Sequence, residues 1–234
     1  MSSIKTTARL AGVLYLVMGL LGWFSIMYVP SVFVVRGDAT ATARNIMNGE
    51  SLYRLGILSQ LASQTIFIFL VLILYDLFKD VDRKYARLMV VLVSVSVAIE
   101  FVNCLNLIAP LILLSGADYW SAFTKSQLDA LALGFLGLRN SGINLVSLFW
   151  GLWLLPLGVL VIKSGFIPKV LGVLLIVACV GYVVGSVTSV VFPGQMHAVS
   201  MVTLPLGGLG ELAIVVWLIV KGANVPQRAL EALK

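Results

Sequence analysis

The chain has 234 residues, of which 60% are hydrophobic and only 11% are charged. About a quarter of the residues of an ordinary soluble domain are charged, so this composition excludes that class and indicates an integral membrane protein surrounded by lipids. The net charge of +6 comes from basic residues at the ends of apolar runs, which is typical of membrane topology. The basic residues form no patch of the kind that binds nucleic acid, and no nucleic-acid partner is expected.

Six apolar segments are long enough to cross a bilayer core of about 30 Å. They predict an all-α fold, in which residues 1–234 form a single membrane domain built as a bundle of six transmembrane helices. The expected spans are about residues 10–29, 52–74, 88–114, 131–162, 170–192 and 201–220. The fourth exceeds the length that one crossing needs, so we expect it to tilt, to protrude or to kink at Pro156.

Two connections between spans are predicted to contain short amphipathic helices. The first connection includes "GDATATARNI", which favours a helix capped by Asp38. The connection after the third span includes "YWSAFTKSQLDALAL", with Thr124 or Ser126 as the expected cap. Tyr119 and Trp120 are expected at the membrane interface.

Basic residues are concentrated in alternate connections, and this pattern predicts that both termini are cytoplasmic. The connections expected outside carry only Arg36, Arg44 and Lys125. The segments expected inside carry Lys5, Arg9, Lys79, Arg83, Lys84, Arg87, Lys163, Lys169, Lys221, Arg228 and Lys234.

Several stretches occur here in an order that resembles a known family. They are "ARLAGVLYL", "VVRGDATATARNIMNGESLYRLGI", "LLSGADYWSAFTKSQLDALALGFL", "SGFIPKVLGVLLIVACVGY" and "GELAIVVWLIVKG". Together they resemble the bacterial domain-of-unknown-function 4386 family of multi-pass membrane proteins, over roughly residues 8–222. The resemblance implies a protein of the bacterial cytoplasmic (inner) membrane with no assigned activity. It also implies histidines in the fourth helix near Asn140 and Trp153, where this chain has none.

Four charged residues lie within the expected spans: Arg54, Glu100, Arg139 and Glu211. A charge in a bilayer core costs a few kcal/mol, so these side chains are expected to face the bundle interior and to find partners. We predict that Arg139 contacts Glu100 or Glu211. Amide side chains at helical spacing accompany the charges, and the full candidate ligand site is Arg54, Gln60, Gln64, Glu100, Asn103, Arg139, Asn140, Asn144 and Glu211.

The sequence favours neither a metal centre nor a cofactor. Cys104 and Cys179 lie in apolar runs and are expected to be buried thiols, and a lone histidine, His197, excludes a zinc site that needs two. The spans contain no Ser/His pair and no aspartate dyad, so the sequence favours no catalytic residue and makes an intramembrane enzyme the least favoured function.

Two other functions stay open. The first is binding or passage of a small amphipathic or lipid-like molecule in an outward-facing polar cavity. The second is an accessory or structural membrane subunit, in an oligomer or with a partner subunit, whose buried polar network only sets the packing of its helices.

Overall fold

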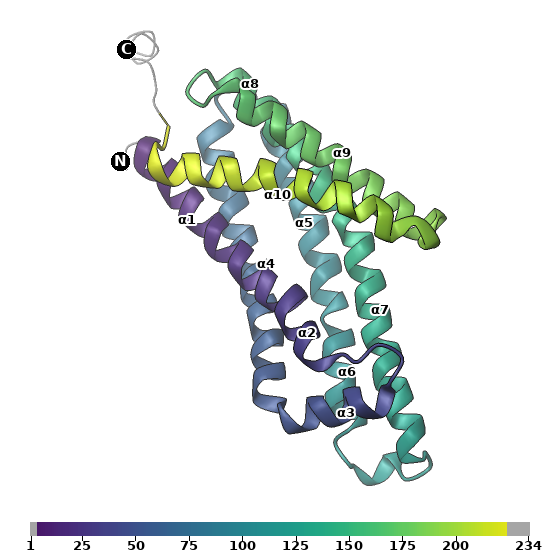
Figure 1. Ribbon diagram of the computed structural model, residues 1–234. Coiled ribbons are helices and arrows are strands. Elements are labelled where there is room, and N and C mark those ends of the chain that lie inside the picture. Colours follow the sequence, from purple (N-terminus) through teal and green to yellow (C-terminus); the bar gives the residue numbers. More distant parts are fainter. Residues whose placement is uncertain (1–3, 224–234) are drawn as a thin grey trace. The chain divides into compact units, whose positions relative to one another are not determined.

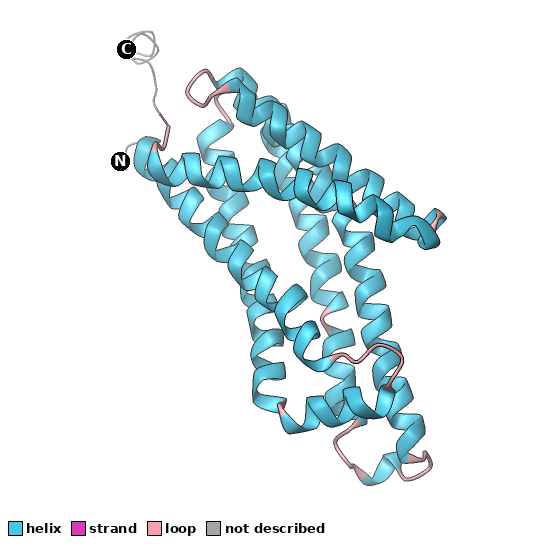
Figure 2. Cartoon of the chain, in the orientation of Figure 1, coloured by secondary structure: helices cyan, strands magenta, loops and turns pink. Residues whose placement is uncertain are grey.

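The computed structural model describes residues 4–223, apart from the side chains of residues 196, 197 and 204. Of the described residues, 87% are helical, and none of them forms a strand (Figure 2). The helices, labelled in Figure 1, are α1 (Ile4–Trp23), α2 (Val29–Phe33), α3 (Ala39–Asn48), α4 (Glu50–Phe78), α5 (Arg83–Asn103), α6 (Leu105–Leu113), α7 (Lys125–Leu152), α8 (Leu154–Ser164), α9 (Lys169–Val191) and α10 (Met196–Val220). A π-helical turn, Phe24–Tyr28, joins α1 to α2, and short 3-10 turns cover Asp118–Trp120 and Pro193–Gln195.

Within the described residues, six helical stretches of 23 to 40 residues are long and apolar enough to cross a membrane. The prediction of a six-span all-α membrane protein is confirmed. Each expected span lies within one of these stretches, apart from residues 114 and 192 at two of the ends. The stretches are Ile4–Phe33, Glu50–Phe78, Arg83–Leu113, Lys125–Ser164, Lys169–Val191 and Ala198–Val220.

The fourth stretch is interrupted near Pro156, and a kink there was one of the three expected outcomes. Proline lacks an N–H group, so Pro156 leaves the carbonyl of Leu152 without its helical partner. Helix α7 ends at Leu152, and α8 begins at Leu154 after a turn at Trp153. Pro30 acts in the same way in the first stretch, where the N–H of Val29 bonds to the carbonyl of Phe24, five residues back.

The chain forms two compact units, whose described parts are residues 4–17, 66–97 and 144–223 (unit 1) and residues 18–65 and 98–143 (unit 2). In unit 1, α9 packs against both α8 and α10 (Figure 1). Gly158 and Gly172 allow close approach of α8 and α9, because a β-carbon on either would lie within 2.7 Å of the other residue's carbonyl oxygen.

The two ends of the described chain lie together in unit 1. The guanidinium of Arg9 in α1 donates to the carbonyl of Val220, the last residue of α10, at 3.2 Å. A second contact joins the connection after α4 to the end of α8, where Lys163 Nζ lies 2.7 Å from Asp82 Oδ2. Unit 1 therefore contains all four segments that the basic residues predict to be cytoplasmic.

Unit 2 contains the first two predicted outer connections. Helix α3 forms as expected, with Asp38 Oδ1 accepting from the N–H of Ala41 at 2.8 Å. Ile46 of α3 is buried in a cluster with Val29, Phe33, Tyr53, Ile57 and Leu107. Met47 is exposed.

In the second outer connection, the predicted helical segment is continuous with the span that follows it. Thr124 caps α7: its Oγ1 accepts from the N–H of Gln127, and its own N–H donates to Gln127 Oε1 at 2.8 Å. This reciprocal pair is a capping box. The polar segment "KSQLD" is therefore the first turn of α7, continuous with the span.

Serine hydroxyls tie α1 to α4 within unit 2. Ser59 Oγ donates to the carbonyl of Leu21 at 3.0 Å, and Ser63 Oγ donates to the carbonyl of Met18 at 2.9 Å. Hydrogen bonds of this kind hold membrane helices together where lipid provides no alternative partner.

Candidate functional site

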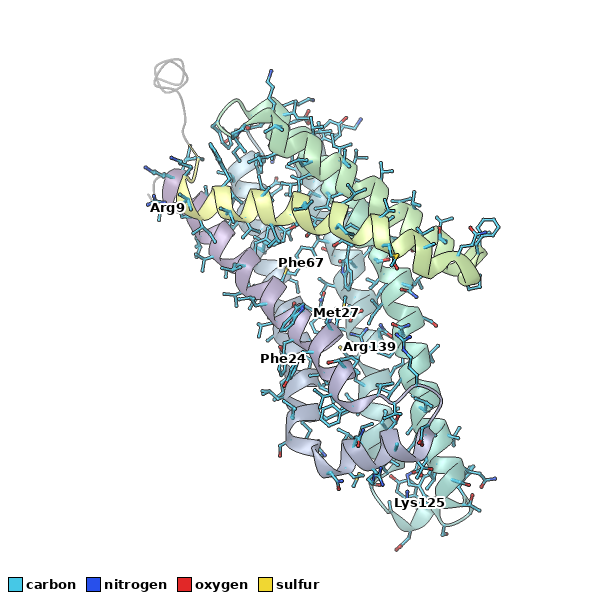
Figure 3. The ribbon with its side chains drawn as sticks, in the orientation of Figure 1. Arg9, Phe24, Met27, Phe67, Lys125 and Arg139 are labelled. Carbon is cyan, nitrogen blue, oxygen red and sulfur yellow. The ribbon has the colours of Figure 1, made fainter. Side chains whose placement is uncertain are left out.

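Unit 2 contains a buried ion pair. Arg139 Nη2 of α7 lies 2.7 Å from Glu100 Oε1 of α5, and both side chains are almost inaccessible, at 5% and 0% exposure. Gln60 of α4 donates its amide to the same oxygen at 2.8 Å. Three helices thus meet at one carboxylate, and the prediction that Arg139 pairs with Glu100 or Glu211 is confirmed for Glu100. Figure 3 labels Arg139 on its helix.

Asn103 completes the network from one turn further along α5. Its amide nitrogen lies 3.3 Å from Glu100 Oε2 and 3.2 Å from the carbonyl of Arg139, and its oxygen accepts from Asn106 at 3.0 Å. The amide reaches the backbone of α7 because residue 142 is glycine: a β-carbon there would lie 2.2 Å from Asn103 Oδ1.

Two buried polar atoms of this network, Arg139 Nη1 and Gln60 Oε1, have no hydrogen-bond partner among the described residues. Gln64 Oε1, on the same face of α4 as Gln60, is also buried without a partner. Gln60 and Gln64 lie four residues apart on one face of α4 and are both buried. A buried polar group without a partner costs about 1–3 kcal/mol, so a donor and two acceptors are left for water or a ligand.

The structure places two predicted members of the site, Arg54 and Asn140, outside the Arg139 cluster. The buried face of α4 carries Tyr53, Ile57, Gln60 and Gln64, and Arg54 lies one residue, or about 100°, away from it. The Arg54 side chain is 59% exposed and forms an ion pair with Glu50 at 2.7 Å.

Asn140 also lies one residue away from the buried face of its helix. It follows Arg139 on α7 and is exposed, whereas Ala132, Arg139 and Val146 repeat every seven residues along the buried face. Asn144 is half-buried and belongs to unit 1, where its carbonyl accepts from Ser186 Oγ of α9 at 2.7 Å.

Glu211 has different surroundings, in unit 1. Its Oε2 accepts from the hydroxyl of Tyr15 in α1 at 2.5 Å, and its Oε1 accepts from the hydroxyl of Tyr182 in α9 at 2.7 Å. Our sequence reasoning missed both tyrosines. Tyrosine has a largely apolar ring and is common in apolar helices, so its sequence context does not mark it as a polar site. The one feature that could have indicated these two residues is a hydroxyl group within a span.

Comparisons with known proteins identify the family of this chain. A family model described as a domain of unknown function (DUF4386) matches residues 10–222. The chain belongs to the DUF4386 family. An uncharacterized protein of Archaeoglobus fulgidus is 34% identical over 85 residues, which are 36% of this chain and 49% of the relative. The chain thus spans about half the length of this curated relative. No solved structure matches the chain.

The DUF4386 protein is a multi-pass membrane protein with two polar clusters in its helices, one around Arg139 and one around Glu211. Its described residues contain no group of three His, Cys, Asp or Glu side chains that could hold a metal ion. Cys104 and Cys179 are buried free thiols, as predicted. The side chain of His197, and Arg228 and Lys234 of the predicted inner segments, lie outside the described residues.

Proposed function

We propose that this protein binds a small amphipathic molecule, a membrane lipid or a molecule similar to one, at the Arg139 cluster of unit 2. The observation that carries the proposal is the set of three unpartnered buried atoms, Arg139 Nη1, Gln60 Oε1 and Gln64 Oε1. A network that only held helices together would gain stability by replacing such atoms with apolar groups.

The chemistry of these atoms defines the ligand. Arg139 Nη1 is a cationic donor and would bind an anionic or carbonyl oxygen of the ligand. The two glutamine oxygens are acceptors and would bind hydroxyl or N–H donors. A head group with both an anionic oxygen and hydroxyl groups satisfies all three. Phosphatidylglycerol has this combination, and phosphatidylcholine has the anionic oxygens without the donors.

Gln64→Met provides the test, because it removes one unpartnered oxygen and conserves length and volume. The purified protein is exchanged into micelles containing equal amounts of phosphatidylglycerol and phosphatidylcholine, and the lipid it retains is measured by native mass spectrometry. We expect the wild type to retain phosphatidylglycerol selectively and Gln64→Met to lose that selectivity. The matched control is Ser63→Ala, which alters the neighbouring contact with Met18 and should keep the selectivity.

A structural subunit is the second candidate, and a specific observation favours it. Both oxygens of Glu100 have partners, and Asn103 fits closely against Gly142. This function predicts that Gln64→Met raises the melting temperature and that neither wild type nor variant selects a lipid. That result would replace the binding proposal.

A further inference from the structure

Glu211 lies far from either end of its span. Residues 198–220 form the sixth stretch, so Glu211 is 13 residues from its first residue and 9 from its last. At about 1.5 Å per residue these distances are roughly 20 Å and 14 Å along the helix. The carboxyl group is therefore placed where an uncompensated negative charge is costly.

The group is half-buried and contacts two tyrosines of unit 1. Its two oxygens accept from Tyr15 and Tyr182, as described above. The ring of Trp153 lies against that of Tyr15 at 5.7 Å between centroids, and the ring of Phe67 meets Trp153 edge-on at 5.1 Å. The two neutral hydroxyl donors stabilise a carboxylate through hydrogen bonds but do not neutralise its charge.

The described residues supply no cation to Glu211, in contrast to Glu100, which has Arg139. The titratable groups that contact it are Tyr15 from α1 and Tyr182 from α9. The basic residues of the helices packed around it lie near helix ends: Lys5 and Arg9 in α1, Lys169 in α9 and Lys221 after α10. His197 lies near the start of α10, and its side chain is outside the described residues.

We propose that Glu211 is a membrane-embedded proton-binding site, at which Tyr15 and Tyr182 hold the ionised form and a proton from water neutralises it. Protonation adds one proton to one carboxyl oxygen, which then becomes a donor. The tyrosine hydroxyl on that oxygen rotates to accept the new hydrogen bond. The site belongs to unit 1 and does not depend on the ligand proposed for unit 2.

An apolar carbodiimide, dicyclohexylcarbodiimide, reports the protonated form on the full-length protein in detergent. The carboxylic acid adds its O–H across one C=N bond of the reagent, and the acyl group then migrates to nitrogen, so the whole mass of the reagent is retained on the residue. We expect peptide mass spectrometry to find this mass on Glu211, with a yield that falls about tenfold per pH unit above the midpoint of the titration. Glu211→Gln should reduce the label on this peptide to background, and Glu100, whose carboxylate pairs with Arg139 and is fully buried, should give less label than Glu211.

Variants of the two tyrosines test whether their hydrogen bonds set the pH at which Glu211 binds a proton, or whether the carboxyl group is only accessible to the reagent. Tyr15→Phe and Tyr182→Phe each remove a hydrogen bond to the ionised form and keep the ring, so each should move the midpoint of labelling to higher pH. Tyr53→Phe, which removes a hydroxyl bonded to the carbonyl of Leu107 in unit 2, should leave the midpoint unchanged.

Infrared difference spectra between high and low pH measure the carbonyl stretching band of a protonated carboxylic acid. This measurement does not require a reagent to reach the carboxyl group. The proposal is overturned if this band shows no component that Glu211→Gln removes. It is also overturned if both tyrosine variants keep the wild-type midpoint.

Discussion

The side-chain amide of Asn103 occupies the space that a side chain at residue 142 would need. A β-carbon on Gly142 would lie 2.2, 2.4 and 2.6 Å from Oδ1, Cγ and Nδ2 of Asn103. The same amide donates toward Glu100 and to the carbonyl of Arg139. A single glycine in α7 thus allows the polar groups of α5 to reach the neighbouring backbone.

Gly142→Ala should therefore destabilise the protein. The new methyl group displaces the Asn103 amide, and the loss of its buried hydrogen bonds should lower the free energy of unfolding by about 1–3 kcal/mol. Thermal unfolding in detergent measures the effect. Gly137→Ala is the matched control on the same helix, because a β-carbon there meets no atom within 4 Å, and it should leave the melting temperature unchanged or slightly raised.

The Glu100–Arg139 pair should show strong coupling in a double-mutant cycle. Glu100→Gln leaves a buried guanidinium without its counter-ion, and loss of one partner of a buried pair costs about 3–5 kcal/mol. The double variant Glu100→Gln/Arg139→Met removes both charges and should be more stable than the sum of the single changes predicts. Additive single effects would argue that the two side chains do not interact in the membrane-embedded protein.

Glu211→Gln is expected to be milder than Glu100→Gln, although both remove a carboxylate from a span. No basic side chain among the described residues contacts Glu211, so the amide leaves no known cation unpaired and perturbs only the two tyrosine hydrogen bonds. We expect a loss of about 1–2 kcal/mol. A loss as large as that of Glu100→Gln, with unchanged retention of co-purified lipid, would indicate that Glu211 neutralises a base.

Stability should fall in acid through the contact between Asp82 and Lys163. The hydrogen bond from the Lys163 ammonium lowers the pKa of the Asp82 carboxyl, and the N–H groups of Tyr85 and Lys84 act in the same direction. A lowered pKa stabilises the folded state above the unfolded-state value of about 3.9, and this contribution disappears as the pH falls through the folded-state pKa. Melting temperatures measured from pH 6 to pH 3 should fall less steeply for Lys163→Met than for the wild type. Lys84→Met should follow the wild type, because it keeps the N–H groups and Lys163.

The orientation in the membrane stays a prediction from the basic residues, and one introduced thiol tests it. Asn48 is exposed at the end of α3, and Cys104 and Cys179 are buried, so Asn48→Cys should provide the reactive site. We expect a membrane-impermeant maleimide to label it from the outer side of intact cells. Labelling only after access to the cytoplasmic side would reverse the predicted topology.

The sequence by itself determined the membrane-spanning character and much of the local structure. Span length and hydrophobicity are local properties that the bilayer imposes on each segment, so six spans could be recognised without knowing their neighbours. The cap at Asp38 and the interruption near Pro156 are also local, because each depends on backbone groups within about four residues.

The partners of the buried polar residues were decided only by the tertiary structure. Arg54 and Asn140 differ from buried Tyr53 and Arg139 by a single position, and the rotation of each helix about its axis determines which of two neighbours faces inward. Glu211 meets Tyr15 across 196 positions of the chain and Tyr182 across 29. A charge in a span requires a partner, but which residue supplies it depends on which helices pack together, and local sequence carries no record of that packing.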